Sequence, residues 1–285
     1  MSPVPGATPE LLEALVDDAG LFPPEQLPMA AALARHRADE AAAHAMLAHR
    51  FLCPASRLDE LRTELGRAGG DAALRLGLIL DTGLPGLSAA LEVVAAEPRL
   101  SLELVEVPVP EGAEVAPALE ALAGVEAAVY LEGPRAELGW VETLAGWSGP
   151  SRRGAKVRCG GARPEQFPSP QELARFISAC AAGNVAFKAT AGLHHAVRAA
   201  DNRTGLVHHG FLNLLVATAR AEQGEADATL TGVLACEEPA ALAEAARSIL
   251  PDQAGRTRSL FVAYGSCSTS EPLEDLAALG LGNQP

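Results

Sequence analysis

Residues 154–192 read GAKVRCGGARPEQFPSPQELARFISACAAGNVAFKATAG and contain one complete strand–helix–strand unit. Short β-type runs at 154–159 and 185–190 flank the segment 170–182, where apolar residues recur every three or four positions, as on one face of a helix. Two strands joined by a helix favour a parallel sheet with a right-handed crossover. The fold prediction is therefore built outward from this unit.

The same alternation extends along the chain on both sides of this unit. Further strands are expected at 51–54, 74–81, 101–107, 127–132 and 258–264, and 229–234 could be another. Helical spacings of leucine and alanine occur at 56–67, 85–96, 113–123, 136–146, 207–222, 239–249 and 272–279. About eight strand–helix units in 285 residues predict an α/β protein with a closed (β/α)8 barrel of the TIM type. An open doubly wound parallel sheet is the alternative, although its typical glycine-rich phosphate loop is missing.

The first part of the chain predicts a helical extension before the barrel. The segments 9–16 and 29–48 have helical patterns. A glycine and two prolines within 17–24 predict a turn between these two helices. The whole chain, 1–285, is then a single domain with the extension over 1–49 and the barrel over 50–280.

The composition narrows the possible partners and the location. A net charge of −14 makes nucleic acids and anionic membrane surfaces unsuitable partners. The chain has no apolar run close to the roughly 18 residues of a membrane span, and it begins without the pattern of a signal peptide. Five scattered cysteines without CxxC spacing are typical of a reduced, cytoplasmic protein. The alanine-rich stretch 29–48 could form the interface of a homo-oligomer.

Lysine is scarce in this sequence, and both lysines lie in the opening unit. Of 22 lysine and arginine residues, only Lys156 and Lys188 are lysines, and a lysine amine can lose its proton and act as a base or nucleophile. Strand alternation places Lys156 and Arg158 on one face of the first strand, and Lys188 and Thr190 on one face of the second. Because the carboxyl ends of barrel strands carry the active site, we expect these side chains in one cavity.

Three cations in one cavity would change the chemistry of the lysines. Each would lower the proton affinity of the others, leaving one lysine partly neutral and nucleophilic near pH 7. The alternative is an ion-pair cluster in which Glu132 or Glu106 neutralises the cations. Glu132 is expected among the catalytic residues, and Gly160 and Gly161 are expected to contact the substrate.

Two histidine pairs follow the second lysine strand. His194 and His195 lie in the loop after it, and an imidazole there suits general acid–base catalysis. His209 and Asn213, near the start of the next helix, are expected to contact the substrate. A metal site built from these histidines and a carboxylate is the competing use, but HxH and HExxH spacings are absent and nearby cations repel a metal ion. We therefore expect neither a metal nor another cofactor.

A hydroxyl-rich segment follows the last predicted strand. Gly265 and Ser266 begin the run Gly-Ser-Cys-Ser-Thr-Ser at 265–270, which leads into a predicted helix. Its backbone N–H groups could bind an anion, as loops after the last strands of barrels often do. A hydroxyl-rich helix cap explains the same residues without a ligand.

Two resemblances add to this interpretation. The run Phe187-Lys-Ala-Thr-Ala-Gly192 resembles the Schiff-base strand of class I aldolases of the deoxyribose-phosphate aldolase type, which implies an imine on Lys188. That family carries a second lysine on the following strand, whereas Lys156 lies on the preceding one. The chain as a whole is similar to a family of bacterial proteins of unknown function through the segments DAGLFPP (18–24), FKATAGLHH (187–195), HGFLN (209–213) and YGSCS (264–268).

The function expected from the sequence is that of a Schiff-base lyase or aldolase. Lys188 would form an imine with a small anionic metabolite, a carboxylated or phosphorylated carbonyl compound. Lys156 and Arg158 would lower the Lys188 pKa and hold the anion, while His194 or His195 moves the proton. The alternatives are a metal-dependent hydrolase or isomerase that uses the histidine pairs, and a non-catalytic barrel that binds an anionic metabolite.

Overall fold

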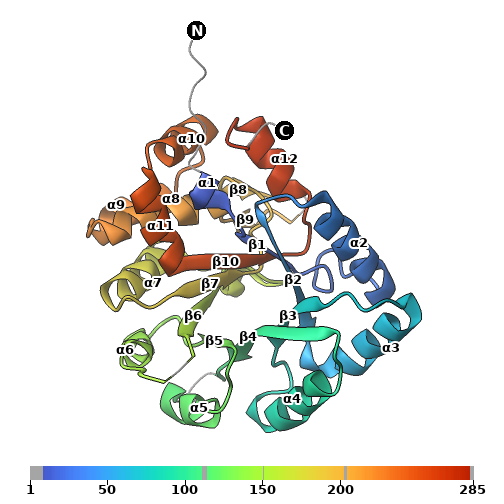
Figure 1. The fold of residues 1–285 in the computed structure, drawn as a ribbon. Coiled ribbons are helices and arrows are strands. Elements are labelled where there is room, and N and C mark those ends of the chain that lie inside the picture. The colour runs from blue at the N-terminus through green and yellow to red at the C-terminus, as the bar shows by residue number, and fades with distance from the viewer. Residues whose placement is uncertain (1–8, 111–113, 150, 202–203, 283–285) are drawn as a thin grey trace.

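The computed structural model describes residues 9–110, 114–149, 151–201 and 204–282. Eight parallel strands close into a barrel in the order β1-β10-β7-β6-β5-β4-β3-β2. Figure 1 shows the helices as an outer layer around these strands. The strands are β1 (Val16–Asp18), β2 (Leu47–Pro54), β3 (Leu74–Ile79), β4 (Leu100–Pro108), β5 (Ala128–Glu132), β6 (Arg153–Arg158), β7 (Phe187–Thr190) and β10 (Phe261–Ser266). The predicted (β/α)8 barrel is confirmed.

The helices mostly follow the predicted segments. They are α1 (Pro9–Leu12), α2 (Met29–Ala42), α3 (Leu58–Ala68), α4 (Leu87–Ala95), α5 (Val115–Ala121), α6 (Gly139–Ala145), α7 (Pro170–Ala182), α8 (Phe211–Glu222), α9 (Asp227–Leu234), α10 (Pro239–Arg247), α11 (Pro251–Leu260) and α12 (Glu271–Ala278). Short 3₁₀ turns lie at Ala55–Arg57, Leu84–Gly86 and Pro164–Gln166, and β8 (Ala199–Ala200) pairs with β9 (Val207–His208) as an antiparallel hairpin between β7 and α8.

Helix α7 illustrates how the local sequence sets these elements. Ser169 and Glu172 form a capping box at its start, and Pro170 occupies a first-turn position where no backbone N–H is needed. Its buried face includes Leu173 and Ile177, spaced one helical turn apart. The helix therefore begins and packs as its sequence pattern predicts.

The prediction of a purely helical N-terminal extension is wrong. Residues Val16–Asp18, placed in a helix and a turn by the sequence pattern, form β1, which pairs in parallel with β10 on one side and β2 on the other. This strand closes the barrel, so the barrel does not begin at residue 50. Two of its three residues are buried carboxylates, Asp17 and Asp18, and a strand of that composition has no hydrophobic signal to detect.

The candidate strand at 229–234 is a helix. Its residues belong to α9, which buries Leu230 and Leu234, four positions apart. Threonine and valine favour strands, but burial of the i, i+4 pair decides the local structure. The number of barrel strands is still eight because β1 takes the place of this segment.

The apolar core lies between the strands and the outer helices. Phe187 on β7 stacks on Phe261 of β10 with ring centroids 5.0 Å apart, and it meets Phe176 of α7 edge-on at 5.4 Å. The barrel interior is different, because Asp17, Glu106 and both lysines are buried there with at most 5% exposure. Buried charges of this kind are costly unless they are paired, so the interior is where a site is expected.

Candidate active site

The centre of the candidate site is a carboxylate shared by the two lysines. Lys156 on β6 and Lys188 on β7 are paired in the strand register, so two like charges lie side by side. The Lys156 Nζ lies 2.6 Å from Glu106 Oε2, and the Lys188 Nζ lies 2.7 Å from Glu106 Oε1. Glu106, on β4, thereby bridges both ammonium groups inside the barrel.

Further carboxylates extend this cluster on both sides. Lys188 also contacts Asp17 of β1, which in turn accepts a hydrogen bond from Arg50 Nη1 at 2.7 Å. Lys156 also lies 3.1 Å from Glu132 Oε2, at the end of β5. Negative and positive groups therefore alternate across the barrel in the order Asp17, Lys188, Glu106, Lys156, Glu132 and Arg158.

A glycine and an aromatic ring shape the space beside the lysines. A Cβ atom on Gly154 would lie 2.6 Å from the Tyr130 ring and 2.5 Å from the Ala186 carbonyl oxygen, so β6 needs glycine here. The Lys188 Nζ lies 5.8 Å from the centroid of the Tyr130 ring, a favourable cation–π position. The small residue on β6 thus makes room for a ring on β5 that adds to the stabilisation of a buried ammonium on β7.

The expectation that the cations lower one another's pKa is wrong for Lys156. Burial lowers the pKa of Lys156, but the charges of Glu106 and Glu132 raise it more, so its pKa lies above the ordinary value. Burial likewise raises the pKa of Glu106, while Lys156 and Lys188 hold it well below its usual range. The ion-pair cluster, the alternative considered from the sequence, is what the structure shows.

A cavity of about 430 Å³ opens at the carboxyl ends of β5 and β6. Its lining consists of Pro108, Val109, Glu132, Gly133, Pro134, Arg135, Ala136, Leu138, Trp140, Lys156, Val157, Arg158, Arg163, Glu165, Gln166, Pro168, Glu172, Leu173 and Phe176. The volume lies within the range of small-molecule sites. Lys156 reaches this cavity, whereas Lys188 is fully buried and is not part of the lining.

Arginine side chains give this cavity anion-binding capacity. The Arg158 Nε donates to Glu132 Oε1 at 3.0 Å, and among the described residues its other guanidinium nitrogens have no partner. Arg135 donates to the Glu165 carbonyl oxygen, but its Nη1 is buried without a hydrogen bond to any described residue. A buried donor without a partner is costly, and a bound anion would satisfy it. Arg158, expected from the sequence, is joined here by Arg135, which was missed.

The structure places His194 and His195 outside this cavity. The His194 ring lies against Cys267, with Nδ1 3.5 Å from the sulfur, and 3.5 Å from Glu271 Oε2. Burial, and then the neighbouring histidines, lower the pKa of His194 to about 4. His195 is largely exposed and lies 3.2 Å from Asp275 Oδ2. Their acid–base role stays a prediction, and Glu132 has the two cations as its partners rather than a histidine.

His209 and Asn213 hold loops together. His209 Nε2 donates to the Pro168 carbonyl oxygen at 2.6 Å and its Nδ1 lies 3.3 Å from an Arg198 donor, while burial lowers its pKa to about 4. Asn213 Nδ2 donates to the carbonyl oxygens of Val233 and Cys236, and its Oδ1 accepts from Arg198 N. Both donor hydrogens of the amide are used, so the expected contact with a substrate finds no support in this position.

The glycines and Thr190 near the strand ends serve close packing. A Cβ on Gly160 would lie 3.1 Å from the Cα of Gly192, and one on Gly161 would lie 2.3 Å from Gln166 Oε1. Gly160 lets the loop after β6 approach the loop after β7, and Gly161 lets the loop after β6 fold on itself. Thr190 pairs in register with both Arg158 and Gly265 at the barrel mouth. Gly160, Gly161, Thr190 and Gly265 do not line the cavity, so their role in binding stays a prediction.

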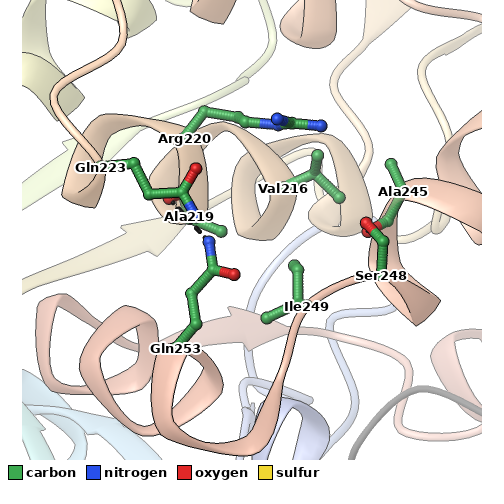
Figure 2. A pocket seen from close by; sticks show the side chains of 8 residues that line it. All are labelled: Val216, Ala219, Arg220, Gln223, Ala245, Ser248, Ile249 and Gln253. Atoms are coloured by element: carbon green, nitrogen blue, oxygen red, sulfur yellow. Dashed lines mark hydrogen bonds between the residues drawn. The ribbon is translucent and has the colours of Figure 1, made fainter.

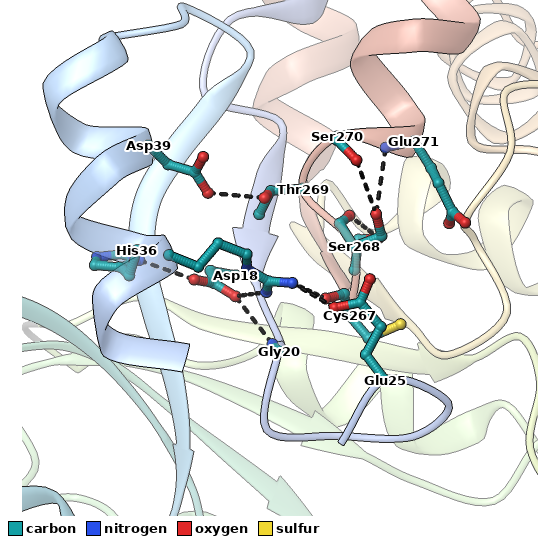
Figure 3. A network of polar contacts seen from close by, with 12 residues as sticks. Asp18, Gly20, Glu25, His36, Asp39, Cys267, Ser268, Thr269, Ser270 and Glu271 are labelled. Atoms are coloured by element: carbon teal, nitrogen blue, oxygen red, sulfur yellow. Dashed lines mark hydrogen bonds and ion pairs between the residues drawn. The ribbon is translucent and has the colours of Figure 1, made fainter. Parts of the chain in front are cut away.

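The hydroxyl-rich segment after β10 belongs to a separate polar network (Figure 3). Ser266 is buried and donates to the Ser268 carbonyl oxygen at 2.6 Å, and Thr269 donates to Asp39 Oδ2 at 2.7 Å. The Ser268 hydroxyl accepts from the backbone N–H of Glu271, the first residue of α12. These contacts favour the helix-cap interpretation over an anion site.

A buried carboxylate on β1 is the other half of this network. Arg35 donates to Asp18 Oδ1 at 2.5 Å and to the Cys267 carbonyl oxygen at 2.7 Å, while His36 Nδ1 lies 3.1 Å from Asp18 Oδ2. Burial raises the pKa of Asp18, but the hydrogen bond from His36 and the charge of Arg35 lower it more. Helix α2 is thereby anchored to β1 and to the loop after β10, a role that the sequence pattern did not indicate.

A second cavity lies within the outer helical layer (Figure 2). Its volume is about 110 Å³, and its lining comes from α8, α11 and the end of α10. Gln253 crosses it and donates to the Ala219 carbonyl oxygen at 3.1 Å. Since none of its lining residues belongs to a barrel strand, it is not the candidate site.

Comparison with known proteins identifies no relative of this chain. No protein-family model, curated protein or solved structure matches this chain. Within the described ranges, no group of three or more histidine, cysteine, aspartate or glutamate side chains is arranged to hold a metal ion. The same ranges contain no helix with the length and apolar character needed to cross a membrane. The resemblance to class I aldolases therefore stays a prediction.

Proposed function

We propose that this protein is a Schiff-base lyase of the aldolase type, in which Lys156 forms an imine with a small anionic carbonyl compound. The observation that carries the proposal is the position of Lys156. Its Nζ lies between the carboxylates of Glu106 and Glu132, and the same side chain lines a cavity that also contains Arg135 and Arg158. An amine, two carboxylates and anion-binding arginines are the groups that imine chemistry on an anionic carbonyl compound requires.

The charge balance of imine formation suits this environment. An ammonium group and a carbonyl compound give a protonated imine and water, so the net positive charge on the nitrogen is retained. The carboxylates of Glu106 and Glu132, which stabilise the ammonium form, stabilise the protonated imine for the same reason. An electrostatic site of this kind needs no rearrangement during the reaction.

Attack on the carbonyl carbon requires the neutral amine, and Glu132 is placed to take its proton. Its carboxylate lies 3.1 Å from the Lys156 Nζ and lines the cavity, whereas Glu106 is almost completely buried. The proton is held by Glu132 while the nitrogen–carbon bond forms. It is then passed to the former carbonyl oxygen, which leaves as water after gaining its second proton from the nitrogen.

The protonated imine then serves as an electron sink. When the bond between the α carbon, next to the imine carbon, and the β carbon breaks, its electron pair moves towards the imine and forms an enamine. A hydroxyl group on the departing carbon loses its proton to Glu132, and that fragment leaves as an aldehyde. Protonation of the enamine and addition of water release the second product and regenerate the Lys156 amine.

Lys188 has a supporting role in this proposal. It is fully buried between Asp17 and Glu106 and does not line the cavity, so a substrate carbonyl has no route to its Nζ in this structure. Its charge balances Glu106 and holds that carboxylate in place for Lys156. The resemblance to class I aldolases implies the opposite assignment, with the imine on Lys188, and the experiment below distinguishes the two.

The scarcity of lysine makes the test direct. The protein is incubated with 2-oxo acids, sugar phosphates and simple aldehydes, borohydride is added, and the reduced adducts are mapped by peptide mass spectrometry. Apart from the amino terminus, only Lys156 and Lys188 can form an imine. We expect an adduct on Lys156 that is lost in Lys156→Arg and retained in Lys188→Arg. An adduct on Lys188 alone would transfer the catalytic role to that residue, and no adduct on either lysine with any compound would contradict the proposal.

A further inference from the structure

We infer that the substrate is a 2-oxo carboxylic acid whose chain is nonpolar apart from the hydroxyl group at the bond that is cleaved, an inference that rests on the proposed function and names its substrate class. Three features of the cavity support it. The anion-binding arginine lies next to the reactive amine, part of the lining is apolar, and the volume exceeds the needs of the smallest oxo acids.

The first feature is the short separation between the amine and the guanidinium group. Lys156 Nζ lies 3.1 Å from Oε2 of Glu132, and Arg158 Nε lies 3.0 Å from Oε1 of the same carboxylate. A substrate that contacts both groups must carry its anionic group close to its carbonyl carbon. A carboxylate on the adjacent carbon meets this condition, and the planar guanidinium matches a carboxylate in a paired geometry.

The second feature is the apolar wall formed by α6, α7 and the segment before α6. It consists of Pro134, Ala136, Leu138, Trp140, Leu173 and Phe176. The Trp140 indole Nε1 donates to the Pro134 carbonyl oxygen at 2.9 Å, so its polar atom is already satisfied. A Cβ on Gly133 would lie 2.5 Å from the same ring, which shows how closely the backbone packs on it. A wall of this composition favours a hydrocarbon chain.

Two polar side chains near this wall are engaged. Gln166 Oε1 accepts from the backbone N–H of Arg163, and Glu172 accepts from the N–H and hydroxyl groups of Ser169 in the cap of α7. The charged groups of the lining lie outside the six apolar residues, so a polyhydroxy chain packed against those six would leave its hydroxyl groups without hydrogen bonds there. The wall therefore favours a nonpolar chain over a sugar chain.

The third feature is the volume. A water molecule takes up about 30 Å³ in the liquid, and we assign the same volume to each heavy atom of a ligand as an upper bound. A small 2-oxo acid with about six heavy atoms then occupies at most about 180 Å³. The cavity has about 430 Å³. The remaining volume of the cavity can hold a chain of several carbon atoms.

Binding of acids without a carbonyl group tests the chain preference independently of imine chemistry. The chain has two tryptophans, so Trp147→Phe leaves Trp140 as the only one, and its fluorescence reports on the cavity. Hexanoate, acetate and glycerol 3-phosphate are titrated into this variant. Each buried methylene strengthens binding by about fourfold, so we expect hexanoate to bind at least about tenfold tighter than acetate.

Two variants show which residues contact the carboxylate and which contact the hydrocarbon chain of hexanoate. Arg158→Met should weaken hexanoate binding by about tenfold or more, because it removes the guanidinium. Leu138→Gln should weaken hexanoate binding with little effect on acetate. Leu250→Gln, which changes an exposed leucine that is not part of the cavity lining, is the matched control and should change neither.

The outcomes separate this inference from the proposed function. In the borohydride assay, 2-oxohexanoate should label Lys156 at about tenfold lower concentration than pyruvate, for the same reason as above. Equal binding of acetate and hexanoate, or tighter binding of glycerol 3-phosphate, would overturn the chain preference while a trapped imine still stood. Tight hexanoate binding without any imine would instead overturn the oxo-acid assignment together with the proposed function.

Discussion

Lys156 and Lys188 occupy paired positions on two adjacent parallel strands, and each ammonium group lies within 2.7 Å of a different oxygen of Glu106. One buried carboxylate thus holds together two cations that would otherwise repel each other. Several consequences of this arrangement can be measured.

Replacement of the shared carboxylate should destabilise the barrel strongly. Glu106→Gln leaves two buried ammonium groups with one carboxylate partner each, and loss of one member of a buried ion-pair network costs about 3–5 kcal/mol. Urea unfolding monitored by circular dichroism measures this loss. The exposed carboxylate Glu237 offers a matched control, Glu237→Gln. A loss below about 1 kcal/mol would mean that the cluster stabilises little.

The lowered pKa of Glu106 predicts that the folded protein loses stability at acid pH. The folded-state pKa of Glu106 is depressed, so its contribution is fully present above the unfolded-state pKa and is lost as the pH falls through the folded-state value. Stability should therefore decline below about pH 4.5 by about 3 kcal/mol towards pH 2 from this group. Unfolding by urea at a series of pH values should show this decline in the native protein and a smaller one in Glu106→Gln.

The rate of imine trapping should be nearly independent of pH across the neutral range. Burial lowers the pKa of Lys156, but Glu106 and Glu132 raise it more; burial raises the pKa of Glu132, but the two cations beside it lower it more, so the resting state is an ion pair. The reactive form, a neutral Lys156 amine beside a protonated Glu132, holds the same number of protons as this ion pair, so its fraction does not change between about pH 6 and 9. Borohydride labelling at low carbonyl concentration measures this profile. A rate that rises about tenfold for each pH unit would show instead that the proton is lost to solvent and not to Glu132.

Replacement of Arg135 should weaken substrate binding without lowering the stability of the fold. Its Nη1 is buried without a partner in the described residues, so Arg135→Met should leave stability unchanged or raise it by up to about 1 kcal/mol. Binding of pyruvate, measured by calorimetry, should weaken by about tenfold because a charged donor is lost. Arg256→Met, which removes an ion pair with Glu222 on the outer helices, is the control. Loss of stability without loss of binding would assign Arg135 a purely structural role.

Replacement of Asn213 should instead lower the stability of the fold without changing substrate binding. Asn213→Ala leaves the carbonyl oxygens of Val233 and Cys236 and the Arg198 N–H without their partner, which should cost about 2–4 kcal/mol. Thermal unfolding measures the loss, and pyruvate binding at a temperature where the variant is folded should be unchanged. Weaker binding by the folded variant would restore the substrate contact expected from the sequence.

The barrel could be predicted because most of its strands are apolar. The runs around Lys156 and Lys188 carry small or apolar residues on their helix-facing side, and α7 has a capping box and a regular buried face. β1 could not be found in this way, since Asp17 and Asp18 are buried by charge pairing that only the tertiary structure creates. α9 was ambiguous because its residue types favour a strand while its leucine spacing favours a helix.

The site could be predicted in part. Strand alternation was sufficient to place Lys156 and Arg158 on one face of β6, and Glu132, named as a possible partner of these cations, contacts both. Glu106, the first of the two carboxylates that raise the Lys156 pKa, comes from β4, distant in sequence, so the predicted direction of the Lys156 pKa shift was wrong. An acidic residue flanked by valines on a mostly apolar strand, as Glu106 is, was the available signal for a buried ion pair.

The position of β1 also bears on how the chain completes its fold. This strand of three residues lies between β2 and β10, so the seam of the barrel joins residues close to the beginning of the chain with residues close to its end. Contacts so distant in sequence are slow to form, and until they do both neighbouring strands present unpaired backbone edges. A variant that lacks residues 1–20 would have no β1. The edges of β2 and β10 would then stay unpaired and could pair with strands of other copies of the chain. The acidic strand that supplies Asp17 to the cluster thus also covers the two strand edges at which edge-to-edge aggregation would begin.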